Sequence, residues 1–144
     1  DACVRLLLGA GANVEAALKD DTTPLYTACA HGHVACVRAL LDAGGNVEAA
    51  DHFGATPLFA ACENEHAGCI HALLEAGAKI HALTKDGETP LSVAAQRDHH
   101  GEAWRRALEH SDDSTRALLC AGAHRHPSMH PILGHAAAAA SAWF

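Results

Sequence analysis

The feature that most constrains this fold is a repeat, because the tripeptide Thr-Pro-Leu recurs at a fixed interval of 33 residues. Its three copies begin at Thr23, Thr56 and Thr89. In a second motif, Leu-Leu-x-Ala-Gly, the first three copies keep the same interval and begin at Leu7, Leu40 and Leu73. Self-similarity at a period of this length is typical of architectures in which one small unit is stacked repeatedly. The sequence therefore predicts a stack of similar units.

Each unit is predicted to be a pair of helices. Thr23 is suited to cap the first helix, and the proline after it fits a first turn in which no amide donor is needed. The chain is expected to turn near Gly32, after which apolar residues recur at helical spacing until Gly44 ends the second helix in the left-handed conformation. Residues 45–55 are rich in turn formers and should form a projecting loop. Such a hairpin cannot bury its apolar face alone, so neighbouring hairpins must stack into a solenoid.

Composition and charge restrict the possible partners. The 144 residues are 49% hydrophobic but only 4% aromatic, which favours one domain of closely packed helices with small side chains. The net charge is -7, and residues 1–98 hold 13 acidic and six basic side chains, which argues against nucleic acid and anionic membranes as partners. No apolar run is long enough to span a bilayer, and no signal peptide is recognisable. We therefore expect an intracellular, cytoplasmic protein with no membrane contact.

The second Thr-Pro-Leu unit carries a clear family likeness. It reads Asp51-His52-Phe53-Gly54-Ala55-Thr56-Pro57-Leu58, followed by Ala61, His66, Leu73-Leu74 and Gly77-Ala78. Over residues 1 to about 98 the chain resembles the ankyrin repeat family. The resemblance implies an all-α ankyrin-repeat solenoid of stacked helix-turn-helix units joined by β-turn-like loops. The histidine that the family carries after Thr-Pro-Leu is replaced by Tyr26, Phe59 and Ser92, which implies the loss of one hydrogen bond in each repeat.

The spacing also predicts how the chain is divided. The Leu-Leu-x-Ala-Gly motif at Leu118 comes 45 residues after Leu73, so twelve extra residues have entered. The inserted residues include Trp104 and Leu108 at helical spacing. We predict the second half of a truncated repeat at 1–17, repeats at 18–50 and 51–83, a repeat at 84–126 with a helical insertion near 99–110, and a degenerate repeat or C-terminal cap at 127–144. Because residues 2–5 match the start of a second helix, the chain is expected to be a fragment of a longer protein.

Cysteines and histidines raise the question of a metal site. Five of the six cysteines occupy two register positions, one shared by Cys3, Cys36 and Cys69 and the other by Cys29 and Cys62. Residues in one register lie on the order of 8 to 10 Å apart, which is too far to share a zinc ion whose ligands lie at ~2.3 Å or to form a disulfide. Cysteines within one hairpin could still approach each other, but packing as small buried hydrophobes is the favoured interpretation.

The histidines are interpreted in the same way. His33, His66 and His99 share a register position at the start of a second helix, where the resemblance implies a structural histidine, and capping or loop bonding would explain them. Residues 124–135 contain four further histidines that could bind a transition metal weakly, although a solvated tail is favoured. We therefore predict no metal ion and no cofactor.

No pattern in the sequence points to catalysis. Gly9-Ala10-Gly11 lies at a predicted helix end rather than between a strand and a helix, so a dinucleotide site is not indicated. Asp20-Asp21 and Asp112-Asp113 are better explained as loop and helix-cap carboxylates than as acid and base pairs. The chain is therefore not expected to be an enzyme.

The expected function is the binding of another protein on a concave face and at the loop tips. The resemblance implies binding positions in each loop and late in each first helix, and these are Lys19, Asp20, Thr22, Ala30, His31, His52, Phe53, Ala55, Glu63, Asn64, Lys85, Asp86, Glu88, Gln96 and Arg97. We add Tyr26 and Phe59 as an aromatic floor, and we expect Phe53 to be the main anchor because exposed aromatic residues are enriched at binding hot spots.

Two other functions stay open at this point. The chain could be the regulatory or targeting segment of a larger enzyme or channel whose active domain lies elsewhere. It could also be a metal-responsive or redox-responsive protein built on its cysteines and histidines, which the register argument disfavours.

Overall fold

The structure, a computed structural model, describes residues 2–90, 92 and 93. Five α-helices lie within these residues: α1 (Ala2–Gly9), α2 (Pro24–Ala30), α3 (Val34–Asp42), α4 (Pro57–Glu63) and α5 (Ala67–Glu75). No strand occurs in this described part of the chain. The predicted all-α architecture is therefore confirmed. The predicted insertion near residues 99–110 and the predicted cap at 127–144 lie outside the described residues.

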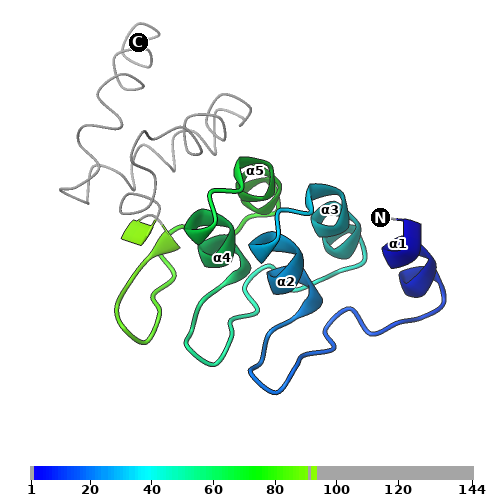
Figure 1. Cartoon of the computed structure of the whole chain (residues 1–144), viewed down its shortest axis with the longest axis horizontal. Coiled ribbons are helices and arrows are strands. Elements are labelled where there is room, and N and C mark those ends of the chain that lie inside the picture. Colours follow the sequence, from blue (N-terminus) through cyan, green and yellow to red (C-terminus); the bar gives the residue numbers. More distant parts are fainter. Residues whose placement is uncertain (1, 91, 94–144) are drawn as a thin grey trace, which may run out of the picture.

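The helices form two rows (Figure 1). The second helices of the units, α1, α3 and α5, make one row, while the first helices, α2 and α4, make the other. Helix α2 packs against both α3 and α4, and α5 packs against both α3 and α4. Each helix pair is thus held by its neighbour, as the stacking of incomplete hairpins requires.

The Thr-Pro-Leu motif starts the first helices as the sequence predicts. The side-chain hydroxyl of Thr23 accepts a hydrogen bond from the backbone amide of Tyr26, and that of Thr56 accepts one from the amide of Phe59, each at 3.3 Å. The prolines that follow take the first helical position, where the missing amide hydrogen costs no helical bond. In the third unit the hydroxyl of Ser92 accepts from the amide of Thr89 at 2.8 Å. The expected loss of a bond in each repeat is therefore wrong for Ser92, because its hydroxyl reaches back to the cap.

Glycines end the second helices and allow the tight turns. Gly44 follows Ala43, the C-cap residue of α3, and has φ +86°, the left-handed conformation expected from the sequence. Gly32, in the turn between α2 and α3, has φ +74°. Its counterpart 33 residues later is Glu65, which adopts φ +57° although it has a side chain. The backbone of the repeat is thus kept even where the sequence does not supply glycine.

The core is built from aliphatic and small side chains. Its largest fully buried members include Leu25, Leu58, Ile70 and Leu73, and alanines and cysteines of α2, α4 and α5 pack among them. Small side chains let the helices approach closely, which agrees with the low aromatic content.

Burial increases along the stack. Leu7 is 61% exposed, whereas its register counterparts Leu40 and Leu73 are 5% and 0% exposed. Cysteines show the same gradient, since Cys3 is exposed, Cys36 is half-buried and Cys69 is buried. The expectation that Cys3 packs in the core is therefore wrong, because no first helix lies beside α1 in the described residues.

Polar side chains also join successive units. A carboxylate oxygen of Glu15 accepts from the backbone amide of Asn46, and one of Glu48 accepts from the amide of Lys79, each at 2.7 Å. The residues of the second bond lie 33 positions after those of the first, so the same contact recurs in successive repeats. They fix the spacing of neighbouring units beyond what apolar packing supplies.

Candidate functional site

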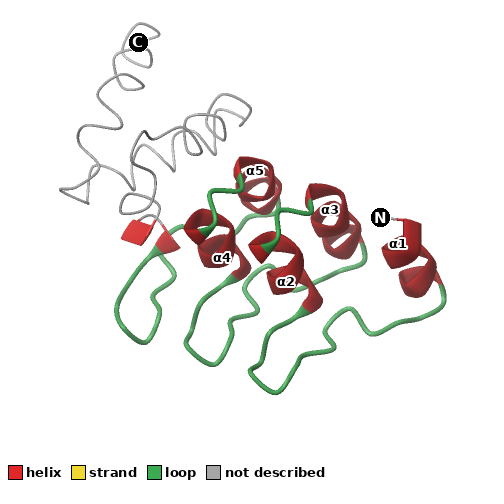
Figure 2. Cartoon of the chain, in the orientation of Figure 1, coloured by secondary structure: helices red, strands yellow, loops and turns green. Residues whose placement is uncertain are grey.

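Three loops project from the same side of the helical stack (Figure 2). Each is closed at its base by a backbone hydrogen bond, from Leu18 to Thr22, from Asp51 to Ala55 and from Thr84 to Glu88. The fourth residue of each loop has positive φ and is Asp21, Gly54 or Gly87. Such a residue lets the chain reverse direction within five residues. We call these three segments the loop row.

Main-chain hydrogen bonds connect the loops to one another. The backbone amide of His52 donates to the carbonyl oxygen of Asp20 at 3.1 Å, and that of Lys85 donates to the carbonyl oxygen of Phe53 at 2.9 Å. Close approach of the third loop is possible because Gly54 has no side chain, since a β-carbon there would lie 3.3 Å from the amide nitrogen of Lys85. The tips are therefore held in a fixed order.

Phe53 occupies the tip of the central loop and its side chain is 57% exposed. Its amide donates to Oδ1 of Asp51 at 2.9 Å, and its carbonyl accepts from the next loop. The ring of His52 lies against the phenyl ring, with centroids 3.8 Å apart. Nδ1 of His52 in turn lies 3.0 Å from the carbonyl oxygen of Asp20. An exposed aromatic side chain is thus presented on a backbone that is bonded on both sides.

Tyr26 lies on α2, the helix that follows the first loop, and is half-buried. Burial raises the pKa of its hydroxyl to about 12, and the negative charges of Asp51 and Glu63, a hydrogen bond with Asp51 and the charge of Asp20 add to the rise. Asp51 belongs to the central loop and Glu63 to α4. Acidic groups of separate elements therefore act electrostatically on this hydroxyl. The surface formed by the loop row together with the partly exposed Tyr26 of α2 and Glu63 of α4 is called the inner face below.

Asp20 is a loop carboxylate held by its own turn. Its Oδ1 accepts from the hydroxyl and from the backbone amide of Thr22. These hydrogen bonds, the side-chain one foremost, lower the pKa of the carboxyl below its ordinary value. Asp20 is therefore a permanent negative charge at neutral pH, as expected of a loop carboxylate.

The residues expected to bind a partner differ in how far they are exposed. The exposed ones are Lys19, Asp20, His31, His52, Phe53, Asn64, Lys85 and Asp86, and the partly exposed ones are Thr22, Tyr26, Ala30, Glu63 and Glu88. Ala55 is buried, and Phe59 is only 8% exposed. Gln96 and Arg97 lie outside the described residues. Most of the predicted positions are thus exposed or partly exposed, while Phe59 offers a partner little surface.

Asp51 was not among the residues expected to bind. It caps its own loop, because its Oδ1 accepts from the amides of Phe53 and Ala55 at 2.9 Å each, and it also contributes to the raised pKa of Tyr26. An aspartate at the first position of a tight loop is a recognisable turn signal. Its electrostatic effect on Tyr26 depends on stacking of the units and has no local signal in the sequence.

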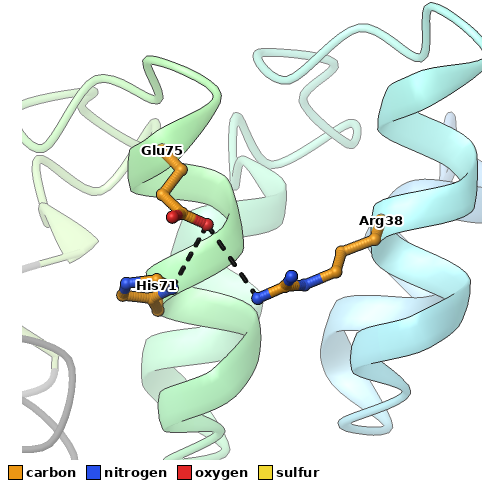
Figure 3. Close-up of polar contacts among 3 residues, drawn as sticks. All are labelled: Arg38, His71 and Glu75. Atoms are coloured by element: carbon orange, nitrogen blue, oxygen red, sulfur yellow. Dashed lines mark ion pairs between the residues drawn. The ribbon is translucent and has the colours of Figure 1, made fainter. Parts of the chain in front are cut away.

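The outer face of the helices carries a different set of charges (Figure 3). Nη2 of Arg38 on α3 lies 4.0 Å from Oε2 of Glu75 on α5, and Nδ1 of His71 lies 3.3 Å from the same oxygen. A shallow groove beside them is lined by Arg38, Leu41, Asp42, Ala72, Glu75 and Ala76. Exposed ion pairs contribute only about 0 to 1 kcal/mol each, so this cluster adds little to stability. The groove lining includes none of the predicted binding residues that the structure describes.

The buried cysteines do not form a reactive site. Burial raises the pKa of the Cys29 and Cys62 thiols well above the ordinary value, and it raises that of Cys69 to about 11. These thiols are therefore protonated and unreactive at neutral pH. Among the described residues, no group of three or more His, Cys, Asp or Glu side chains is placed to hold a metal ion.

His33 and His66 share a register position but make different contacts. Nε2 of His66 lies 3.2 Å from the carbonyl oxygen of Ala30, so this side chain bonds to the turn of the preceding unit. Neither His33 nor His66 caps its helix through its side chain. The ring of His33 instead stacks on that of His31, with centroids 6.2 Å apart. Loop bonding is thus confirmed for His66 and side-chain capping is wrong for both, while His99 lies outside the described residues.

Comparison with known proteins identifies the repeat. A family model described as ankyrin repeats in three copies matches residues 1–84. No curated protein matches the chain. None of the helices within the described residues is long and apolar enough to cross a membrane.

Proposed function

Since this chain belongs to the ankyrin repeat family, we propose that it is a non-catalytic module that holds a partner protein on its concave inner face and loop tips. Ankyrin repeats are generally protein-protein interaction modules, and ankyrin repeat domains are typically non-catalytic. The part specific to this chain is the proposed binding surface, which is the loop row together with the partly exposed Tyr26 of α2 and Glu63 of α4.

The single observation that carries the proposal is the exposure of Phe53 at the tip of the central loop. More than half of its side chain is exposed, although exposure of an aromatic ring to water is unfavourable. Its backbone is bonded to Asp51 within the loop and to Lys85 of the next loop. A loop backbone held in this way needs little ordering when a partner binds, which favours Phe53 as an interface anchor.

The surroundings of Phe53 suit an interface rim. Lys19, Asp20, Lys85 and Asp86 are exposed at the neighbouring tips and carry charges of both signs. Interfaces commonly combine a central aromatic side chain with a polar, solvent-accessible edge. The loop row therefore offers both elements on adjacent tips.

Site-specific photo-crosslinking tests the proposal directly. The 144-residue chain is prepared with benzoylphenylalanine in place of Phe53, and, as the matched control, with the same photoreactive residue in place of Asp42, which is exposed on the outer helix α3. We expect position 53 to capture a defined protein from cell extract, and position 42 to capture none. An excess of unmodified chain should compete with capture, whereas an excess of the Phe53→Ala variant should not. Equal capture at both positions would refute the proposed surface.

A further inference from the structure

We propose that His52 is the positioning residue of the Phe53 anchor, because its imidazole is bonded to the first loop and supports the phenyl ring in one orientation before a partner arrives. This inference rests on the proposed function, since it assumes that Phe53 contacts a partner protein. It adds how the anchor is held and which residue sets its orientation.

His52 is tied to the first loop by two hydrogen bonds to one atom. Its backbone amide donates to the carbonyl oxygen of Asp20 at 3.1 Å, and its Nδ1 lies 3.0 Å from the same oxygen. A carbonyl oxygen can only accept, so Nδ1 carries the hydrogen of this bond. Because main chain and side chain are bonded to one acceptor, the imidazole is fixed relative to the first loop.

The imidazole held in this way supports the phenyl ring of Phe53. The centroids of the two rings lie 3.8 Å apart, and their planes are inclined by 43°. Rings at this separation are in van der Waals contact. Phe53 is 57% exposed and does not belong to the core cluster, so core packing does not orient its ring. The orientation of the anchor therefore depends on a neighbour at the surface, and that neighbour is His52.

The other link of the loop row shows that an imidazole is not needed to join two loops. The backbone amide of Lys85 donates to the carbonyl oxygen of Phe53 at 2.9 Å, which is the same link one unit later. The two tip residues are Lys85 and Asp86 in the third loop and Lys19 and Asp20 in the first, so neither of these tips carries a ring. The additional bond of an imidazole thus occurs at the tip that carries the aromatic anchor.

Support of this kind has a consequence for binding. The backbone of Phe53 is already bonded to Asp51 and to Lys85, so the freedom that remains is rotation of the side chain. Contact with the imidazole restricts that rotation, and a side chain that is ordered in advance loses less conformational entropy on association. His52 therefore contributes to affinity through Phe53, and the first loop contributes through a carbonyl oxygen rather than a side chain.

Nuclear magnetic resonance of the purified 144-residue chain tests the contact without a partner. We expect nuclear Overhauser effects between the imidazole and phenyl protons, and nitrogen shifts that place the hydrogen of the neutral imidazole on Nδ1. With 4-fluorophenylalanine at position 53, His52→Ala should move the fluorine resonance toward its position in the urea-unfolded chain. Absence of the Overhauser effects, or a fluorine resonance that His52→Ala leaves unchanged, would overturn the inference.

Three variants of His52 separate support of the ring from the link between the loops. His52→Asn keeps a side-chain donor, because its Nδ2 corresponds in position to Nδ1 of histidine, but it has no ring. His52→Phe keeps a ring but has no donor, and His52→Ala has neither. All three variants keep the backbone amide that donates to Asp20, so the main-chain link is common to them.

Each variant serves as the competitor when the photoreactive residue at position 53 captures its partner. We expect His52→Phe to compete within about threefold of the unmodified chain, and His52→Asn and His52→Ala to compete roughly three- to tenfold less effectively, because ring support lowers the cost of ordering the anchor. Thermal unfolding of each variant identifies any loss that comes from misfolding. Rescue by asparagine but not by phenylalanine would mean that His52 serves only the link between the loops, which contradicts the inference. A phenylalanine variant that competes no better than the alanine variant contradicts it as well.

The two proposals fail in different ways. If position 53 captures a partner but His52→Ala competes as well as the unmodified chain, the positioning role is wrong and the proposed function stands. If position 53 captures nothing, the proposed function fails by its own test, and the positioning role fails with it.

Discussion

The imidazole of His66 lies against the backbone of Gly32 in the preceding unit, so closely that a β-carbon on that glycine would come within 2.7 Å of Nδ1. The same ring reaches the carbonyl oxygen of Ala30 through Nε2. One side chain thus bonds to the preceding turn and fills the space beside it. The two units stack in this arrangement because position 32 carries no side chain.

Gly32→Ala should destabilise the protein by about 2 kcal/mol or more, since the variant suffers both left-handed backbone strain and a clash with His66. Gly44→Ala is the matched control, because Gly44 also has positive φ but a β-carbon added there would meet no atom within 4 Å. The control should lose only about 1 kcal/mol. Urea unfolding measures both variants, and equal losses would contradict the role given to His66.

Glu65→Gly should stabilise the protein. Glu65 adopts φ +57° in the turn where its register counterpart is Gly32. Relief of the left-handed strain, ~1 to 2 kcal/mol, exceeds the added entropy of a glycine in the unfolded chain, so we expect a net gain of about 0.5 to 1 kcal/mol. Glu65→Gln keeps the β-carbon and should leave the free energy of unfolding unchanged. A gain of the same size in the glutamine variant would show that charge, and not backbone strain, is responsible.

Phe53→Ala and Phe59→Ala should differ sharply in their effect on stability. Phe53 is 57% exposed, so its truncation should change the free energy of unfolding by less than about 0.5 kcal/mol. Phe59 is 8% exposed and belongs to the core cluster, so its truncation should cost about 3 to 5 kcal/mol. Thermal or urea unfolding of the two variants checks this contrast. A large loss for Phe53→Ala would mean that the tip ring serves the fold rather than a partner.

Stability should fall as the pH rises above about 8.5. Burial raises the pKa of Cys69 to about 11 and that of Cys29 still further, so these thiols keep their protons in the folded chain at pH values where the unfolded chain releases them. The folded state then binds more protons than the unfolded state. The stabilisation is fully present below pH ~8.5 and decreases on the order of 2 kcal/mol per thiol by pH ~10.

Urea unfolding at pH 8 and pH 10 measures this effect. A variant with alanine at Cys29, Cys62 and Cys69 is less stable at both values because it leaves small cavities, but its stability should depend less on pH. Parallel behaviour of the two proteins would show that other groups cause the alkaline loss.

Thiol labelling should follow the burial gradient along the stack. Cys3 is exposed and should react with iodoacetamide within minutes, and the half-buried Cys36 should react more slowly. Cys29, Cys62 and Cys69 are buried and should react only after unfolding. Mass spectrometry of peptides from the labelled protein assigns each site. Rapid labelling of Cys62 in the folded protein would contradict the packing of α4.

The features that the sequence predicts well are local. Thr23 and Thr56 identify the first helices because a capping threonine followed by proline favours a helix start whatever surrounds it. Gly44 identifies the end of α3 for the same reason, since few other residues adopt the left-handed conformation readily. Repetition then extends these local signals to the whole stack.

Other features depend on neighbours and could not be read from the register. Leu7 and Leu73 share one register position, yet they differ from exposed to fully buried, because burial depends on which helices lie alongside. Tyr26 and Phe59 also share a position, but Tyr26 is half-buried whereas Phe59 is only 8% exposed. The electrostatic effect of Asp51 on Tyr26 joins residues of different units, so neither local propensity nor periodicity indicates it.

The links between successive loops run from main chain to main chain, from His52 to Asp20 and from Lys85 to Phe53. An amide and a carbonyl are supplied by almost every residue type, so most changes of side chain at these tips leave the links intact. Evolutionary drift or library selection can therefore rewrite the tip sequences while the scaffold beneath keeps its shape. Recognition and folding are, to that extent, separately adjustable in this protein.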